Sequence, residues 1–203
     1  MPPLTYIYFS GIRGLLLPLF NFTFQHFQVD YIFSNTIVRM PSSQEQRIPI
    51  NNTSTLRIDF TVLLDDYATY FFKNVTNLLN RSCALPYLPE TFKLAQNVSG
   101  NETILLPNIN LNTYFFEIFR RKSLLYFYPK TKEYTALDIQ EINTQNNSIK
   151  LVNPPEMELS KSGVLAPLIK VFIEEMTFQE LNFDTSYINV KAIEIYFSEE
   201  MWQ

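Results

Sequence analysis

The clearest secondary-structure signal in the chain is the segment Leu56-Arg57-Ile58-Asp59-Phe60-Thr61-Val62-Leu63-Leu64. Apolar residues occupy its even positions, and Arg57, Asp59 and Thr61 lie between them. Alternation with a period of two residues is typical of a β-strand that has one buried face and one solvated face. The segment therefore predicts a half-buried strand over residues 56–64.

Two acidic residues, Asp65 and Asp66, follow this strand directly. After them, apolar side chains recur at the spacing of one helix face, at Tyr67, Phe71, Val75 and Leu78. Carboxylates at the start of a helix favour the positive end of its dipole and satisfy free backbone N–H groups. The pattern predicts one helix over about residues 66–80, with the two aspartates at its beginning.

Most of the remaining segments have the composition of short strands separated by turn residues. Strands are predicted over residues 28–33, 46–50, 104–106, 113–119, 123–128, 136–142, 148–152, 168–178 and 187–197. The strands over 113–119 and 123–128, on either side of Arg120-Arg121-Lys122, are expected to form a hairpin. The strands over 136–142 and 148–152 are expected to form a second hairpin.

The last predicted strand changes the parity of its apolar residues between Val190 and Ile193. A β-bulge near Lys191 and Ala192 would produce this change, and burial of both faces of the strand would do so as well. The elements together predict a mainly β fold, an antiparallel β-sandwich or barrel-like sheet with one helix.

The first 25 residues have a different character from the rest. They are apolar and aromatic without a clean period, and proline and glycine interrupt them repeatedly. We expect residues 1–25 to form an N-terminal arm that contacts neighbouring subunits. Residues 26–203 are expected to form a single β-rich domain, which suits a chain of this length.

The composition points towards extensive protein contacts. Charged residues make up 18% of the chain, below the roughly 25% of an average soluble domain, whereas aromatic residues make up 15%. Interface cores deplete charge and enrich aromatic residues, although a monomer with an unusually aromatic core is the alternative. The net charge of −4 and the lack of a Lys/Arg stripe argue against nucleic-acid binding.

Targeting signals are weak. The apolar run over residues 14–20 is interrupted by Pro18, is too short to span a bilayer and is followed by no cleavage site, so no membrane insertion is expected. Asn-x-Ser/Thr triplets leave a secreted glycoprotein open, and they begin at Asn21, Asn51, Asn52, Asn74, Asn80, Asn97, Asn101 and Asn146. A secreted domain normally carries paired cysteines, and this chain has one.

The residues available for chemistry are few. Cys83 and His26 are the single cysteine and the single histidine, which exclude an internal disulfide and a thiolate zinc site. The sequence contains no phosphate-binding glycine loop and no nucleophile elbow. Cys83 is expected to be a small core residue, and His26 a packed or surface side chain. We predict no catalytic, metal-binding or cofactor-binding residue, and no enzymatic activity.

Paired carboxylates are the remaining candidates for catalysis. Asp65–Asp66 are accounted for by the helix start, and Glu199–Glu200 lie in the C-terminal tail. Glu174–Glu175 are expected to point to opposite faces of their strand. Glycoside hydrolysis needs two carboxylates across a cleft, and none of these pairs is predicted to provide them.

Several landmarks, taken in chain order, resemble a family of minor tail and tail-tip proteins of tailed bacteriophages. They are Glu45-Gln46-Arg47, the strand Arg57–Leu64, the helix ending at Leu78-Leu79, Leu85-Pro86-Tyr87, the β-pair Tyr134–Val152, Ala166-Pro167-Leu168, Met176-Thr177-Phe178 and the closing Ile195-Tyr196-Phe197. The resemblance covers about residues 40–198. The chain departs from the family pattern in lacking a tryptophan near residue 87 and in having few glycines.

This resemblance implies a structural subunit of a virion, comparable to a distal tail protein that joins the tail tube to the tail tip. Such a subunit would form a ring of identical copies around the tail axis. It would contact tail-tube and tail-tip proteins, reside in the virion tail and assemble in the bacterial host cytoplasm. Glu45 and Arg47 are predicted interface residues, because bidentate Arg–carboxylate contacts hold neighbouring subunits well. Arg120 and Arg121 are predicted interface residues as well.

Two other functions stay open on the sequence. The first is a carbohydrate-binding β-sandwich for receptor recognition, in which aromatic side chains of residues 113–128 would stack on sugar. The second is a hydrolase of a cell-wall polymer, which would need a carboxylate pair drawn from distant parts of the chain.

Overall fold

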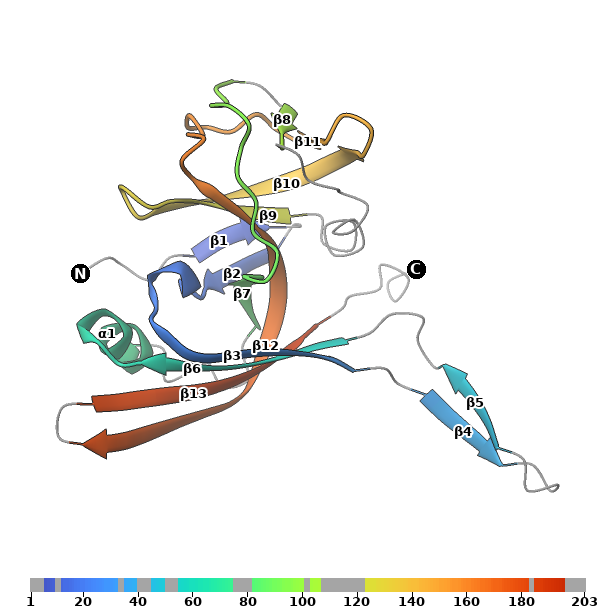
Figure 1. Ribbon diagram of the computed structural model, residues 1–203, viewed down its shortest axis with the longest axis vertical. Coiled ribbons are helices and arrows are strands. Elements are labelled where there is room, and N and C mark those ends of the chain that lie inside the picture. The colour runs from blue at the N-terminus through green and yellow to red at the C-terminus, as the bar shows by residue number, and fades with distance from the viewer. Residues whose placement is uncertain are drawn as a thin grey trace. The chain divides into compact units, whose positions relative to one another are not determined.

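The computed structural model describes residues 6–9, 12–32, 35–39, 45–49, 55–74, 82–100, 103–106, 123–182 and 185–195. These residues form strands, one α-helix and one short 3-10 helix (Figure 1). The mainly β fold class predicted from the sequence is confirmed. The chain divides into two compact units, one made of residues 1–22 and 82–170 and the other of residues 23–81 and 171–203.

The first unit is built on eight strands in the spatial order β1-β2-β7-β12-β9-β10-β11-β8. Their bounds are β1 Tyr6–Phe9, β2 Ile12–Leu16, β7 Ser82–Pro86, β8 Thr103–Leu105, β9 Ser123–Tyr128, β10 Glu133–Asn143, β11 Ser148–Leu151 and β12 Val164–Asn182, with the 3-10 helix η1 at Leu19–Asn21. The strand β12 continues into the second unit beyond Lys170. The pairs with a described register are antiparallel, except for the parallel pair β2–β7.

The N-terminal residues are part of this unit. Within the predicted arm, residues 6–9 and 12–16 form β1 and β2, which pair with each other. Ile7 and Leu16 are buried in a cluster with Ala84, Leu125 and Leu168. Apolar side chains of the segment are thus covered by the chain's own core, and contact with neighbouring subunits stays a prediction.

The core of the first unit surrounds Tyr126, whose side chain is fully buried. Its hydroxyl accepts a hydrogen bond from the Ser160 backbone N–H at 2.8 Å and donates one to the Ser160 carbonyl oxygen at 3.1 Å.

The predicted hairpin β10–β11 is confirmed, and Asn147 in its turn has a positive φ of 48°. The strand β9 pairs with β10 and β12, whereas its predicted partner, residues 113–119, lies outside the described residues.

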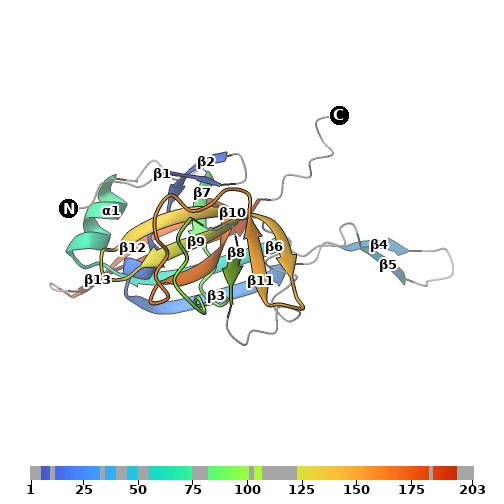
Figure 2. The ribbon, with the colours of Figure 1, turned by 90° about the horizontal axis from the view of Figure 1, so that it is seen from above.

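The second unit contains an antiparallel four-stranded sheet in the order β3-β6-β13-β12. Its strands are β3 Phe24–Ile32, β6 Thr55–Leu63, β13 Thr185–Glu194 and the part of β12 that follows Lys170. The strand predicted over 56–64 is confirmed as β6, because its four even-numbered apolar side chains are at most 1% exposed. Two further strands, β4 Asn35–Arg39 and β5 Glu45–Pro49, form a separate two-stranded sheet (Figure 2).

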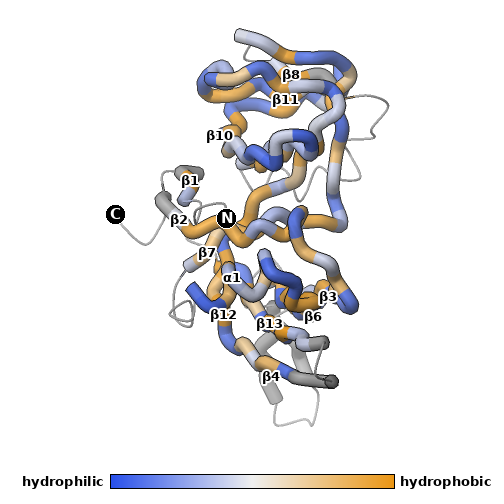
Figure 3. The backbone as a smooth tube through the Cα atoms, turned by 90° about the vertical axis from the view of Figure 1, so that its left-hand side faces the viewer, coloured by the Kyte–Doolittle hydropathy of each residue, from blue (hydrophilic) through white to orange (hydrophobic). Residues whose placement is uncertain are grey.

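The helix α1 extends from Asp66 to Asn74 and directly follows β6. The backbone N–H of Ala68 donates to Oδ1 of Asp65 at 2.7 Å, which confirms Asp65 as the cap. The helix buries Ala68, Phe71 and Phe72. Hydrophobic segments also recur along the strands of both units (Figure 3). The predicted continuation of the helix over residues 75–80 lies outside the described residues.

The bulge expected in β13 lies in its partner strand. Ile173 pairs with Ala192 and Glu175 with Lys191, so that Glu174 is the extra residue of β12. Of the two explanations that the sequence leaves open, a bulge within β13 is wrong, whereas burial of Ala192 and half-burial of Ile193 agree with partial burial of both faces. The parity change in β13 is accompanied by half-burial of Ile193 rather than by an irregularity of β13 itself.

Candidate functional site

The polar face of the four-stranded sheet carries the best-defined group of polar side chains. Strand register aligns them in rows, because paired residues of neighbouring strands project from the same face. The first row contains His26, Thr61, Asn189 and Thr177, and the second contains Gln28, Asp59, Lys191 and Glu175. The opposite face carries the buried apolar residues of β6 and β13.

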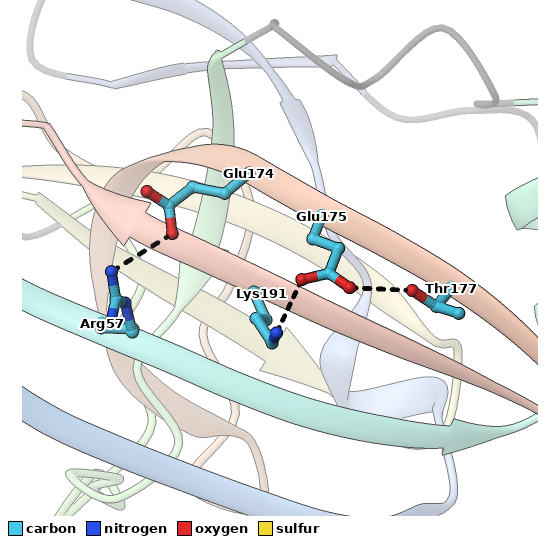
Figure 4. A network of polar contacts seen from close by, with 5 residues as sticks. All are labelled: Arg57, Glu174, Glu175, Thr177 and Lys191. Atoms are coloured by element: carbon cyan, nitrogen blue, oxygen red, sulfur yellow. Dashed lines mark hydrogen bonds and ion pairs between the residues drawn. The ribbon is translucent and has the colours of Figure 1, made fainter.

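The bulge changes which side chains reach this face. Glu174 lies 3.7 Å from Arg57 in an ion pair that joins its Oε2 to Nη2. Oε2 of Glu175 accepts a hydrogen bond from the Lys191 ammonium at 2.6 Å, and its Oε1 accepts one from the Thr177 hydroxyl at 3.1 Å (Figure 4). Arg57 and Lys191 lie on the same face, so the prediction that Glu174 and Glu175 point to opposite faces is wrong. An extra residue in a strand resets the alternation of its side chains.

The Lys191–Glu175 contact shifts the pKa of both groups. The hydrogen bond from Lys191, followed by that from Thr177, lowers the pKa of Glu175. The hydrogen bond to Glu175 raises the pKa of Lys191. Both side chains are about half exposed, so solvent screens the pair and the contact holds their geometry more than it stabilises the fold.

A hollow of about 300 Å³ opens over these rows. It is lined by His26, Asp59, Phe60, Thr61, Glu175, Thr177, Gln179, Asn189, Val190 and Lys191, all from the second unit. The Thr61 hydroxyl donates to Oδ1 of Asn189 at 2.7 Å. That bond leaves the Asn189 amide nitrogen as the donor available to a ligand.

Asp59 differs from the other polar residues of the hollow. Its Oδ1 is buried, and no described residue of the chain offers it a hydrogen bond. A buried carboxylate oxygen without a partner is costly. The Asp59 carboxylate therefore lacks one of the hydrogen bonds that would offset its partial burial.

The two residues considered for nucleophilic or general-base chemistry belong to different units. Cys83 is fully buried in β7, and its burial raises its pKa to about 12. The thiol is therefore neutral at physiological pH, and the prediction that Cys83 is a core residue is confirmed. His26 is an exposed residue of the outer strand β3 and lines the hollow.

The predicted interface residues are only partly described. Glu45 and Arg47 lie on β5, where the backbone of Glu45 pairs with Arg39 and that of Arg47 with Ile37, and their side chains lie outside the description. Arg120 and Arg121 fall outside the described residues altogether.

Of the described aromatic side chains proposed for sugar stacking, two are buried and Tyr128 is half-buried against the core of the first unit. Tyr126 is fully buried and Phe127 is 6% exposed, whereas residues 113–122 lie outside the described part of the chain. In β9, at least, these rings belong to the core. Sequence reasoning missed the hollow instead, whose only sequence signal is the run of polar residues between the apolar residues of β6.

Neither a metal site nor a membrane-spanning helix is found among the described residues. They contain no group of three or more His, Cys, Asp or Glu side chains placed to hold a metal ion. None of their helices has the length and hydrophobicity needed to cross a membrane.

No protein-family model matches the chain, and no curated protein matches it in sequence.

Proposed function

We propose that the chain is a non-enzymatic structural subunit of a bacteriophage virion, a minor tail or tail-tip protein that assembles as a ring around the tail axis. The observation that carries the assembly is the four-stranded sheet of the second unit, whose two outer strands expose apolar side chains. The assignment to a phage tail comes from the sequence landmarks between residues 40 and 198.

The first outer strand is β3. Within the described residues it pairs with β6 alone, over its whole length. Its Phe24, Phe27 and Val29 are half-buried, and Tyr31 is 47% exposed. An outer strand of nine residues presents a row of backbone groups that another strand can pair with, and it contains no proline or lysine to discourage such pairing.

The second outer strand is β12. Its other neighbours, β7 and β9, belong to the first unit, so β12 ends the described sheet of the second unit. Here Phe178 is 51% exposed and Met176 is half-buried. Both lie on the apolar face, where Phe178 pairs with Ile188 and Met176 pairs with Val190. Ile188 and Val190 are at most 1% exposed. The apolar surface that this sheet leaves uncovered is concentrated at its two outer strands.

The strand directions suit a ring. Neighbouring strands alternate in direction across the sheet, so β3 and β12 run in opposite directions. If β12 of one copy lies beside β3 of the next, the antiparallel alternation continues across the junction. This contact joins two different surfaces, and repeated head-to-tail contacts of this kind form a ring where the rotation between copies closes and a filament where it does not. The low charge and high aromatic content of the chain support the same conclusion.

The test is the mass of the purified chain by multi-angle light scattering, alone and after co-production with the other proteins of its operon. A ring of fixed mass, alone or within a larger particle, is expected. Tyr31→Lys and Phe178→Lys should release monomers, because each places a charge at an outer strand. Tyr6→Lys and Val152→Lys are matched controls, since these residues of the first unit are each 50% exposed. A wild-type chain that stays monomeric under both conditions would sink the proposal.

A further inference from the structure

We propose that the hollow on the polar face of the second unit is a binding site for a neutral saccharide. The site lies on the polar face of the sheet, whereas the exposed apolar side chains of the proposed assembly lie on the other face, and the inference does not depend on that assembly. It rests on Asp59, on the fixed donors around it and on the balance of charge in the hollow.

Asp59 provides the acceptor. It lies in β6 between Gln28 of β3 and Lys191 of β13, so strands flank it on both sides. Its Oδ1 is buried and finds no donor among the described residues. Asp59 also lines the hollow, so a ligand hydroxyl there can donate to the carboxylate at Oδ2 and offset its incomplete hydrogen bonding.

The donors are fixed before a ligand arrives. The Thr61 hydroxyl holds the carbonyl oxygen of Asn189, which leaves the amide N–H groups as donors. Glu175 holds the ammonium group of Lys191 at 2.6 Å and is itself held by Thr177. A site whose polar groups are fixed in advance loses less entropy on binding.

Charge selects the class of ligand. The hollow contains two carboxylates, from Asp59 and Glu175, and one ammonium group, from Lys191. The two carboxylates would repel an anionic ligand, and the ammonium group would repel a metal cation. A neutral ligand whose groups both donate and accept hydrogen bonds suits the mixture, and sugar hydroxyls do both.

Size agrees with a small ligand. The volume of about 300 Å³ lies at the lower end of the range for small-molecule sites, roughly 300–1,000 Å³. Gln179 lies at the exposed rim and adds an amide group there. The site is therefore expected to take one or two sugar rings of a longer glycan.

The experiment is isothermal titration of the full chain with maltose, lactose, cellobiose and N,N′-diacetylchitobiose. We expect at least one of the four to bind. Asp59→Asn should weaken that binding by about tenfold or more, because a hydrogen bond to a charged group contributes at least that much. Asp30→Asn is the matched control, since Asp30 lies on the same face but outside the hollow, and it should bind as the wild type does. Gln179→Ala, at an exposed position, should weaken binding as well and serves if Asp59→Asn does not fold.

Two outcomes would overturn the inference. One is that none of the four disaccharides binds. The other is binding that neither Asp59→Asn nor Gln179→Ala weakens, which would place the sugar elsewhere. The monomeric variant Tyr31→Lys should still bind the sugar, so failure of ring assembly and failure of this site can be told apart.

Discussion

Replacing Gly163 with alanine tests the tightest packing contact of the first unit. A Cβ atom at this position would overlap Cε2 of Tyr126 and lie 2.5 Å from its Cζ and hydroxyl oxygen. Non-bonded carbon atoms pack best about 3.5–4.0 Å apart, so one of the two groups has to move. The Tyr126 ring is fully buried, and Ser160 holds its hydroxyl from two sides.

The expected loss of stability has two parts. Forcing an extra methyl group into a well-packed core costs about 1–3 kcal/mol. If the ring moves, both hydrogen bonds to Ser160 are lost as well, at about 1 kcal/mol each. We therefore expect Gly163→Ala to lower the free energy of unfolding by about 3–5 kcal/mol, a large share of the roughly 5–15 kcal/mol of a typical domain.

Urea unfolding followed by circular dichroism measures this loss, and a shift of the midpoint at constant slope identifies it as a change in stability. Gly100→Ala is the control, because alanine there is expected to destabilise through backbone conformation and not through a steric clash. Gly100 has a φ of +61° and open space where the Cβ would lie, so alanine there costs about 1–2 kcal/mol through its backbone alone.

The two glycine positions should also respond differently to a second change. In a Tyr126→Leu background the cost of Gly163→Ala should shrink, whereas the cost of Gly100→Ala should not, because a Cβ at Gly100 meets no atom within 4 Å and its cost lies in the backbone. A Gly163→Ala protein as stable as the wild type would refute the reasoning, since it would mean that the ring does not lie against Gly163.

Three further outcomes follow from single contacts. Asp65→Ala should lower the free energy of unfolding by about 1 kcal/mol through loss of the helix cap, and an unchanged urea midpoint would contradict that cap. The thiol of Cys83, with a pKa raised to about 12 by burial, should react with an aromatic disulfide reagent only after unfolding, whereas rapid reaction of the native chain would contradict its burial. The pKa of Glu175 is lowered in the fold by Lys191, so the stabilisation is present above the ordinary carboxyl pKa and is lost as pH falls through the folded value. Because solvent screens the half-exposed pair, Glu175→Gln should lose only slightly less stability on acidification than the wild type, and a steeper acid dependence than that of the wild type would refute the contact.

Local patterns predicted the elements whose structure depends on neighbours in sequence. The alternation from Leu56 to Val62 gave the strand β6, and the Asp65 cap gave the start of α1. The turn between β10 and β11 was found for the same reason, since its amide-rich residues tolerate the positive φ of Asn147. In each case the chemistry that fixes the backbone lies within a few residues.

Features that depend on distant partners were less accessible to the sequence. Residues 6–16 show no clean period, because the partners that bury them lie more than sixty residues later, in β7 and beyond. The change of apolar parity in β13 indicates either a bulge there or burial of both faces. The extra residue is instead Glu174 of β12, and one strand's sequence does not reveal which strand of a pair accommodates an irregularity.

The same alternation also gives different environments to Asp30 and Asp59. Each is a polar residue between apolar neighbours in a strand, and both lie on the polar face of one sheet. Asp30 belongs to the outer strand β3 and is exposed, with an amide hydrogen bond from Gln28 at 3.0 Å. Asp59 belongs to β6, where strands flank it on both sides, and one of its carboxylate oxygens is buried. The order of strands therefore decides which of two similar carboxylates is solvated and which needs a donor. That order became known only with the fold, and it makes Asp59 the residue on which the saccharide proposal depends.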